Sequence, residues 1–296
     1  MKLHTVVDGV PLGEGPVWCP DGTLVITHIS PGGLRRIDPA NGASERIASM
    51  PGGANAAQLA SDGGFVVTQN GGIDFTVFAD SLGLNASKIP YAPGTPGLQR
   101  VRPTGEVEYL LDEGFSAPND LVVATDGTIF FTDPPQLKHG RHSDAAEGRF
   151  WAYEPGGQVR LIAEGFSYDN GVALSPEGRP LIVEGSGLLW IDPNTGDREW
   201  FVEKLAGESP GDGFCFDVEG RVYVCCPTDH CVRILDRDGH ELEMVELGEG
   251  ALPTNCCLGG EDGKTLFTTE LAPGRVMALE GLPAPGLPLT PWPAPD

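Results

Sequence analysis

Residues 119–132 read Asn-Asp-Leu-Val-Val-Ala-Thr-Asp-Gly-Thr-Ile-Phe-Phe-Thr. Two apolar runs are joined here by the dipeptide Asp126-Gly127. An acidic residue followed by Gly between strand-forming residues is a strong hairpin signal, because Gly tolerates the positive φ of a tight turn. The stretch therefore predicts two antiparallel strands, with a polar Asn-Asp step at the start of the first one.

The same turn recurs along the chain at intervals of 41 to 64 residues. The six turns are Asp21-Gly22, Asp62-Gly63, Asp126-Gly127, Glu177-Gly178, Glu219-Gly220 and Asp262-Gly263. A β-rich run follows each turn, and residues 35–47, 189–202 and 232–247 each add a second hairpin. Four strands in roughly 40–45 residues are typical of one blade of a β-propeller.

The repeats predict an all-β fold, a six-bladed β-propeller of four-stranded antiparallel blades around a central channel, with residues 1–296 as a single domain. The last repeat is one strand short, and the N-terminal run Leu3–Val7 has no blade of its own. We expect this N-terminal strand to complete the last blade and close the ring, since closure leaves no open sheet edge. A Pro-rich tail, residues 282–296, follows the last repeat.

Composition narrows the classes of function. Hydrophobic residues make up 40% of the chain, which is enough for a sizeable core. The formal net charge of -23 disfavours binding to nucleic acid or to an anionic membrane surface. We expect a small-molecule substrate and a monomer or small homo-oligomer.

Cysteine usage and the N-terminus suggest a location. The chain has 7 cysteines, an odd number, and two adjacent pairs, Cys225-Cys226 and Cys256-Cys257, which suit no disulfide framework. The sequence contains no CxxC spacing of the kind that would indicate a zinc site. The first residues hold no apolar stretch of signal-peptide length. We therefore expect reduced cysteines and a cytoplasmic protein.

An oxygen-bearing side chain stands seven residues before every turn. These residues, called the channel residues below, are Glu14, Asn55, Asn119, Asn170, Asp212 and Asn255. The first strand of each blade lies nearest the propeller axis, so equivalent positions at its start form a ring around one mouth of the channel. Carboxylate and amide oxygens without His or Cys suit a hard divalent cation. Calcium is the leading candidate, and magnesium, manganese and zinc are also compatible.

Two insertions lengthen the repeats, at residues 71–97 and 133–148. Both follow the second strand of a blade, so we expect them over the face that holds the metal. Long loops at a ligand-binding face commonly carry specificity.

Four stretches together resemble the senescence-marker-protein-30 / gluconolactonase-like family of metal-dependent six-bladed propeller hydrolases. They are LGEGPVW at 12–18, APNDLVVATDGTIFFTDP at 117–134, DNGVALSPEG at 169–178 and GDGFCFDVEGRVYV at 211–224. The resemblance covers the inner strands of four blades and, through the repeats, nearly the whole chain.

We expect the metal to be held by four of the channel residues, Glu14, Asn119, Asn170 and Asp212. The resemblance implies that Glu14, Asn170 and Asp212 bind the metal and that Asp212 is the catalytic acid/base. Asn119 corresponds to a direct ligand in phosphotriesterase-type propellers, and to a residue near the substrate or a water on the metal in sugar lactonases. Animal sugar lactonases carry an Arg two residues before this Asn, where this chain has Ala117. A less polar lactone or another ester therefore fits as well as a sugar lactone.

We expect a lactonase, that is, a metal-dependent hydrolase that opens a lactone to a hydroxy acid. The cation polarises the carbonyl, and Asp212 is the acid/base, acting directly on water or orienting a water on the cation. Candidate substrate-binding residues are Asn55, Asn119, Gln69, Asn255 and His139. The alternatives are a phosphotriesterase-like hydrolase on the same metal and a non-enzymatic calcium-binding propeller.

Overall fold

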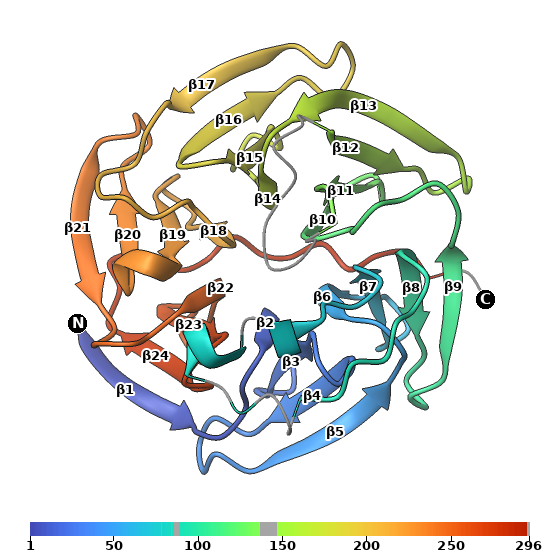
Figure 1. Cartoon of the computed structure of the whole chain (residues 1–296). Helices are drawn as coiled ribbons and strands as arrows, with labels where there is room; N and C mark the ends of the chain where they lie inside the picture. The colour runs from blue at the N-terminus through green and yellow to red at the C-terminus, as the bar shows by residue number, and fades with distance from the viewer. Residues whose placement is uncertain (78, 84, 86–88, 137–146, 295–296) are drawn as a thin grey trace.

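Six antiparallel sheets of four strands each stand in a ring around a central axis (Figure 1). This computed structural model describes residues 1–77, 79–83, 85, 89–136 and 147–294. The arrangement confirms the predicted all-β six-bladed propeller.

The blades follow one another along the chain, and each strand pairs with the next. Blade 1 contains β2 (Gly13–Trp18), β3 (Leu24–His28), β4 (Gly33–Ile37) and β5 (Ser44–Ser49), and blade 2 contains β6 (Ala54–Leu59), β7 (Phe65–Gln69), β8 (Gly97–Val101) and β9 (Val107–Leu111). Blade 3 contains β10 (Leu121–Val123), β11 (Ile129–Asp133), β12 (Gly148–Tyr153) and β13 (Val159–Phe166), and blade 4 contains β14 (Asp169–Leu174), β15 (Pro180–Glu184), β16 (Gly187–Ile191) and β17 (Arg198–Val202). Blade 5 contains β18 (Phe214–Phe216), β19 (Val222–Cys226), β20 (Cys231–Leu235) and β21 (Glu241–Glu246), and blade 6 contains β22 (Pro253–Gly259), β23 (Thr265–Glu270), β24 (Val276–Glu280) and β1 (Lys2–Val7). Short 3-10 helices are η1 (Phe75–Val77), η2 (Ala79–Leu82) and η4 (Pro227–Asp229).

The N-terminal strand closes the ring. Strand β1 pairs antiparallel with β24, with Lys2 opposite Glu280 and Thr5 opposite Met277. Blade 6 therefore takes its outermost strand from the start of the chain and its other three from the end (Figure 1). The predicted closure is confirmed, and this pairing covers the edge that β24 would otherwise expose.

The hydrophobic core lies between neighbouring blades. Val25 and Leu34 of blade 1, for example, pack in one cluster with Phe65 and Val67 of blade 2. Side chains alternate between the two faces of a strand, and both faces of a blade meet another blade, so the middle strands are apolar almost throughout. This packing fixes the inner strands, and with them the channel residues, relative to one another.

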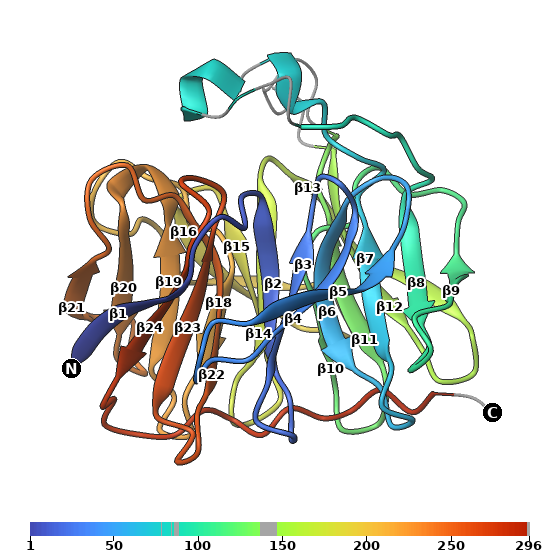
Figure 2. The ribbon, with the colours of Figure 1, turned by 90° about the horizontal axis from the view of Figure 1, so that it is seen from below.

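The two faces of the ring carry different segments (Figure 2). The described part of 71–97 lies over one face, where Phe75 and Ala79 pack against Leu12 and Ile29. The C-terminal tail crosses the opposite face, on the side of the acidic-Gly turns. Of the second insertion, residues 137–146 lie outside the described part of the chain, and His139 with them.

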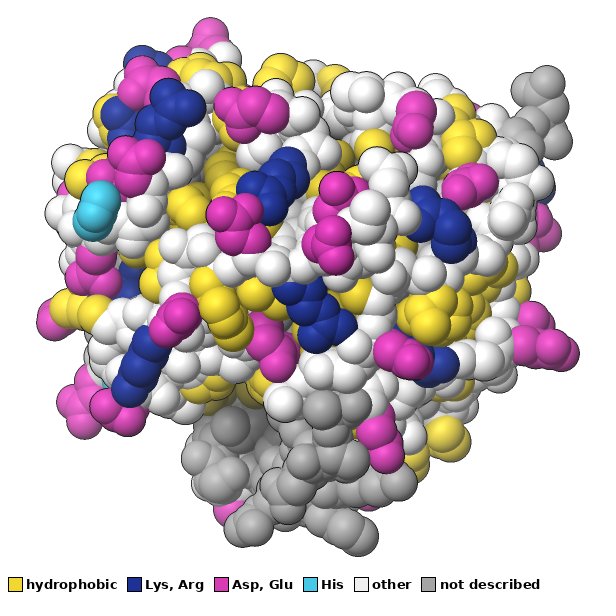
Figure 3. All heavy atoms as spheres, turned by 90° about the horizontal axis from the view of Figure 1, so that it is seen from above, with side chains coloured by type: hydrophobic (Ala, Val, Ile, Leu, Met, Phe, Trp, Pro, Cys, Tyr) yellow, Lys and Arg dark blue, Asp and Glu magenta, His cyan; other side chains and the backbone are white. Residues whose placement is uncertain are grey.

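Acidic and basic side chains are interspersed on the side of the ring seen in Figure 3. The basic residues in that view form no continuous patch. Among the described residues, no helix has the length and apolar character needed to span a bilayer.

Candidate metal and catalytic site

Each channel residue lies where the regular pairing of its inner strand is interrupted. The register between the first and second strands shifts at Glu14/Val17, Ala54/Ala57, Asp169/Val172 and Pro253/Asn255. In blades 3 and 5 the inner strand begins only after Asn119 and after Asp212. A bulge of this kind redirects a side chain out of the regular alternation, so the irregularity allows the channel residue to face the axis.

Threonine hydroxyls hold several channel residues in place from the neighbouring blade. Thr27 of blade 1 donates a hydrogen bond to the carbonyl oxygen of Asn55 at 2.6 Å, and Thr132 of blade 3 does the same to Asn170 at 2.6 Å. Thr68 of blade 2 donates to the carbonyl of Asn119. These threonines end the β-rich runs that follow the turns, so the repeated Thr positions the next blade's channel residue.

Small residues follow the channel residues because the next blade comes close. A Cβ at Gly171 would lie 2.5 Å from the carbonyl oxygen of Asp212, and one at Gly15 would lie 2.6 Å from the Cα of Ala56. Distances this short exclude any side chain. A glycine directly after the channel residue therefore allows the channel residues of adjacent blades to approach one another.

Three carboxyl groups are buried together on the axis: Glu14, Asp120 and Asp212. Burial raises the pKa of Glu14 well above its usual value, and the charges of Asp212 and Asp120 add to the effect. Burial and the charge of Asp120 likewise raise the pKa of Asp212, although hydrogen bonds from Gly213 and Asn170 oppose them. Burial is also the main cause that raises the pKa of Asp120 to about 7. Clustered carboxyls with raised pKa values are characteristic of a site that a cation would neutralise.

Asn170 offers an oxygen with no partner in the protein. Its Nδ2 donates to the phenol oxygen of Tyr168 at 3.1 Å, while its Oδ1 is buried and accepts no hydrogen bond from the described residues. Leaving such an atom buried and unpaired is costly. With two carboxylates beside it, the free oxygen fits a hard cation.

Charged ligands alone do not complete a metal site. Among the described residues, no three His, Cys, Asp or Glu side chains are arranged to hold a metal ion. A cation bound here would therefore need the amide oxygen of Asn170 besides Glu14 and Asp212, with water in its remaining positions.

The amides of three asparagines form a chain at the same level of the channel. Asn70 donates to Oδ1 of Asn55 at 2.9 Å, and Asn55 donates to Oδ1 of Asn119 at 3.1 Å. Gln69 behaves differently, because its carboxamide oxygen accepts the N–H groups of Gly53 and Gly71. Gln69 therefore orders the adjacent loops, whereas Asn119 is half-buried at the end of the amide chain.

Asn255 reaches across the channel. Its Nδ2 donates to both carboxylate oxygens of Asp120, at 2.8 and 3.0 Å. Because blades 3 and 6 are separated by two blades on either side, this bridge spans the axis between opposite sides of the ring. Asn255 is thereby engaged with Asp120, and its side chain also acts to lower the pKa of Glu14.

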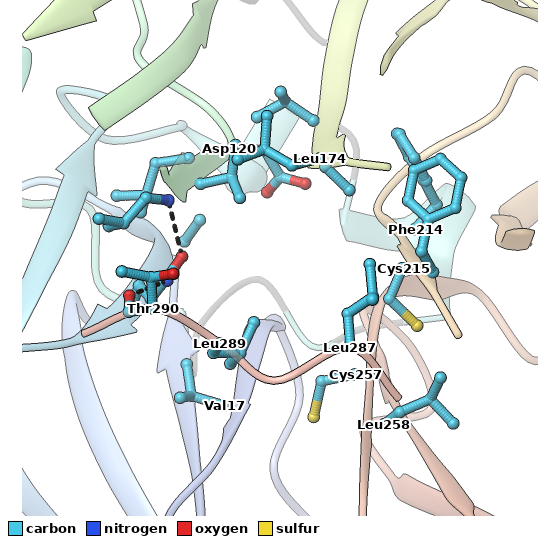
Figure 4. A pocket seen from close by; sticks show the side chains of 18 of the residues that line it. Val17, Asp120, Leu174, Phe214, Cys215, Cys257, Leu258, Leu287, Leu289 and Thr290 are labelled. Carbon is cyan, nitrogen blue, oxygen red and sulfur yellow. Dashed lines mark hydrogen bonds between the residues drawn. The ribbon is translucent and has the colours of Figure 1, made fainter. Parts of the chain in front are cut away.

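A cavity of about 340 Å³ occupies the channel beyond this bridge. Asp120 and Asn255 are part of its lining, as are Leu287 and Thr290 of the C-terminal tail, and most of the remaining walls are apolar (Figure 4). The tail therefore crosses the end of the cavity away from the channel residues.

Two residues of the site were missed by reasoning from sequence. Asp120 broke the pattern of small residues after the channel residue, and this exception was the signal that it has a role of its own. Tyr168 lies two residues before Asn170, and nothing in the sequence marks it. Of the predicted residues, Glu14 and Asn170 both interact with Asp212. Asn55 and Asn119 hydrogen-bond each other, and Asn255 hydrogen-bonds Asp120.

The fold and the site together define a class: six-bladed propellers with carboxylate and amide side chains at one mouth of the channel. The model of the SMP-30/Gluconolactonase/LRE-like region matches residues 12–272. The chain belongs to this family, as the sequence resemblance predicted.

Individual relatives are consistent with this family assignment. The chain is 29% identical to the gluconolactonase of Zymomonas mobilis, over 90% of this chain and 78% of the relative. It is 26% identical to a pentonolactonase of Haloferax volcanii, over 91% of this chain and 85% of the relative. Among solved structures, the calcium-binding protein regucalcin from Agrobacterium tumefaciens shares the fold, with a TM-score of 0.77, 19% identity and coverage of 98% and 97%.

Proposed function

We propose that this protein is a lactonase that uses a divalent cation held by Glu14, Asn170 and Asp212. Calcium is the first candidate for this cation. The unpartnered Oδ1 of Asn170 beside two buried carboxyl groups is the observation that carries this proposal. Relatives named as a gluconolactonase, a pentonolactonase and a calcium-binding regucalcin support the lactone and the cation.

The bound cation would polarise the lactone carbonyl and lower the energy of the developing oxyanion. Asp212 takes the proton from the attacking water, and it returns that proton to the leaving ring oxygen. Tyr168 accepts a hydrogen bond from Nδ2 of Asn170, which leaves the amide oxygen available for the cation. The backbone hydrogen bond from Asp212 N to Cys225 O, at 2.9 Å, anchors the residue that moves the proton.

Substrate contacts come from the amide chain at the same mouth. We propose that Asn119, which is half-buried, hydrogen-bonds a ring or hydroxyl oxygen while Asn55 orients it. Gln69 and Asn255 are left out of this proposed contact set because the protein itself engages their amides.

The substrate is proposed to be a lactone with few hydroxyl groups. Ala117, at the position where animal sugar lactonases carry Arg, is buried, and its N–H donates to Asp133 at 2.8 Å. Position 117 therefore supplies no cation for a sugar. The described part of 71–97 supplies apolar side chains over the same face, and we propose that this insertion covers the bound substrate.

A cytoplasmic location is part of the proposal. All seven cysteines are free thiols, as suits a reducing compartment.

The test is a pH-indicator assay of acid release over a panel that includes glucono-lactone, simple alkyl lactones and an organophosphate. We expect turnover of lactones that a chelator abolishes and calcium restores. Asp212→Ala should lose at least about a hundredfold in rate and should also bind calcium more weakly. Asp238→Ala, which removes an exposed turn carboxylate, is the matched control. Turnover of the organophosphate alone would favour the phosphotriesterase alternative. No turnover, with calcium affinity unchanged in Asp212→Ala, would refute the site.

A further inference from the structure

Two thiols from neighbouring blades face each other in the channel. Cys215 on β18 and Cys256 on β22 have their sulfur atoms 3.7 Å apart. The two inner strands are joined by a backbone hydrogen bond from Gly213 N to Thr254 O, at 2.7 Å, two residues before each cysteine. The short distance between the sulfurs thus rests on a fixed contact between the strands.

The pair is accessible from the channel. Both cysteines line the cavity of about 340 Å³, and Figure 4 shows Cys215 on its wall. Cys215 is half-buried, whereas Cys256 is almost completely buried. A second pair, Cys226 and Cys231, lies opposite each other on β19 and β20, but both are wholly buried inside blade 5. A small reagent in the cavity therefore reaches the first pair and not the second.

One member of the pair has a lowered pKa, although as a neutral thiol its Sγ donates to the carbonyl oxygen of Tyr223 at 3.2 Å. Burial raises the pKa of Cys256, but hydrogen bonds from the thiols of Cys215 and Cys225 and from the N–H of Cys215 outweigh it and lower the pKa to about 5. Thiolates, and not thiols, react with peroxides.

We propose that Cys215 and Cys256 form a reversible disulfide when a hydroperoxide enters the channel cavity. One thiolate attacks a peroxide oxygen, the O–O bond breaks, and a sulfenic acid forms with loss of water or alcohol. The other thiol attacks the sulfenic sulfur and gives its proton to the leaving hydroxide, so that the S–O bond breaks and water leaves as the S–S bond forms. The two thiols lose two electrons in total and one peroxide is reduced. Closure shortens the 3.7 Å separation to about 2.05 Å.

The disulfide would join blades 5 and 6 next to the bridge across the channel. The N–H of Cys256 donates to Oδ1 of Asn255 at 2.8 Å, and Asn255 holds Asp120. Neither cysteine is among the proposed metal ligands, so the inferred modification does not depend on the proposed hydrolysis.

The test treats the whole protein with hydrogen peroxide, blocks free thiols in denaturant, and maps peptides without reduction. We expect the 7 free thiols to fall to five, a linked peptide pair that contains Cys215 and Cys256, and full recovery with dithiothreitol. Cys215→Ser should give no linked peptide. Cys226→Ser, which disrupts the other pair, should still give the Cys215–Cys256 link.

Three results would overturn the inference. The first is wild-type protein that keeps all its thiols after peroxide. The second is a link between Cys226 and Cys231 in place of the expected one. The third is a Cys225–Cys256 link that persists in Cys215→Ser, because it would show that the 3.7 Å contact does not select the partner.

Discussion

At the scale of single residues, the channel contains groups that a structure built for stability alone would avoid. Glu14, Asp120 and Asp212 repel one another when charged, and Oδ1 of Asn170 is buried without a partner. Each of these features costs free energy of folding in the absence of a ligand. Their convergence on the axis is what points to a bound cation.

Replacing Asn170 by Ala removes the unpartnered oxygen. We expect calcium affinity to fall at least tenfold. The unfolding free energy of the metal-free protein should change by less than about 1 kcal/mol, because loss of the Nδ2 hydrogen bond to Tyr168 is offset by removal of a buried oxygen that has no partner. Calorimetric titration and urea unfolding measure the two quantities. Asn194→Ala, in an exposed turn, is the control. Calcium affinity equal to that of the control would contradict the assigned role.

The raised pKa values predict how the metal-free protein responds to pH. Folded Glu14 and Asp212 keep their protons to a higher pH than in the unfolded chain, as does Asp120 with its pKa of about 7 against an ordinary 3.8. The folded state then binds more protons, so the contribution of these groups to stability decreases as pH rises above about 4, and for Asp120 the decrease continues up to its folded pKa of about 7.

Calcium should reverse this trend, because it favours the ionised carboxylates. We expect the increase in melting temperature on adding calcium to be larger at pH 8 than at pH 5, as measured by differential scanning fluorimetry. Asp212→Asn should flatten the pH dependence of the metal-free protein. Equal calcium shifts at both pH values in the wild type would speak against a buried carboxylate site.

At the scale of the strand, the bulge and the threonine hydroxyl act together. The bulge aims a channel residue at the axis, and Thr27, Thr68 or Thr132 holds the carbonyl of that residue from the preceding blade. Blade 4 has Val183 in the equivalent place, so a β-branched residue without a hydroxyl also fits the strand. The hydroxyl is therefore needed to position the channel residue of the next blade and not to fill space in the strand.

The variant Thr132→Val tests whether the threonine hydroxyl positions the channel residue of the next blade. The substitution keeps the shape but removes two hydrogen bonds of the hydroxyl, the one it donates to the carbonyl of Asn170 at 2.6 Å and the one it accepts from the N–H of Asp120 at 3.1 Å. We therefore expect a loss of about 1–3 kcal/mol in unfolding free energy and weaker calcium binding. Thr268→Val is a matched control, because the buried Thr268 hydroxyl has no hydrogen-bond partner among the described residues. That variant should be neutral or slightly more stable in chemical denaturation. Equal losses in both variants would refute the positioning role.

At the scale of the molecule, the two chain ends secure the ring in different ways. Strand β1 completes blade 6, while the tail runs under the channel to blade 2. There Trp292 is buried, and its backbone N–H and carbonyl bond Leu59 and Ser61, each at 2.8 Å. The tail thus links the last blade to the second one across the face opposite the channel residues (Figure 2).

Trp292→Ala should cost about 3 kcal/mol in unfolding free energy, because it empties a large buried site, while calcium affinity stays unchanged at the distant mouth. Leu289→Ala is the control in the same tail: Leu289 is 45% exposed, and we expect a change within about 0.5 kcal/mol. Urea unfolding with calcium titration checks both. Altered calcium affinity in Trp292→Ala would show that the two ends of the channel are coupled.

Local sequence patterns predicted much of this architecture. The acidic-Gly turns predicted the hairpins, their repetition predicted six blades, and the missing strand of blade 6 predicted the role of Leu3–Val7. The channel residues were found by counting back from the turns. Asp120 was not assigned, because its role depends on Asn255, which is 135 residues away in sequence.

The sequence alone determined the number of blades, the closure of the ring and the oxygen-bearing residue at the start of each inner strand, because turns and strand patterns depend on neighbouring residues. Only the tertiary structure decided which of those oxygens stay free, since a hydrogen bond such as that of Asn255 to Asp120 forms only when distant blades meet. Burial likewise depends on the whole ring. For that reason the raised pKa values of Glu14 and Asp212, and the free oxygen of Asn170, became visible only in three dimensions.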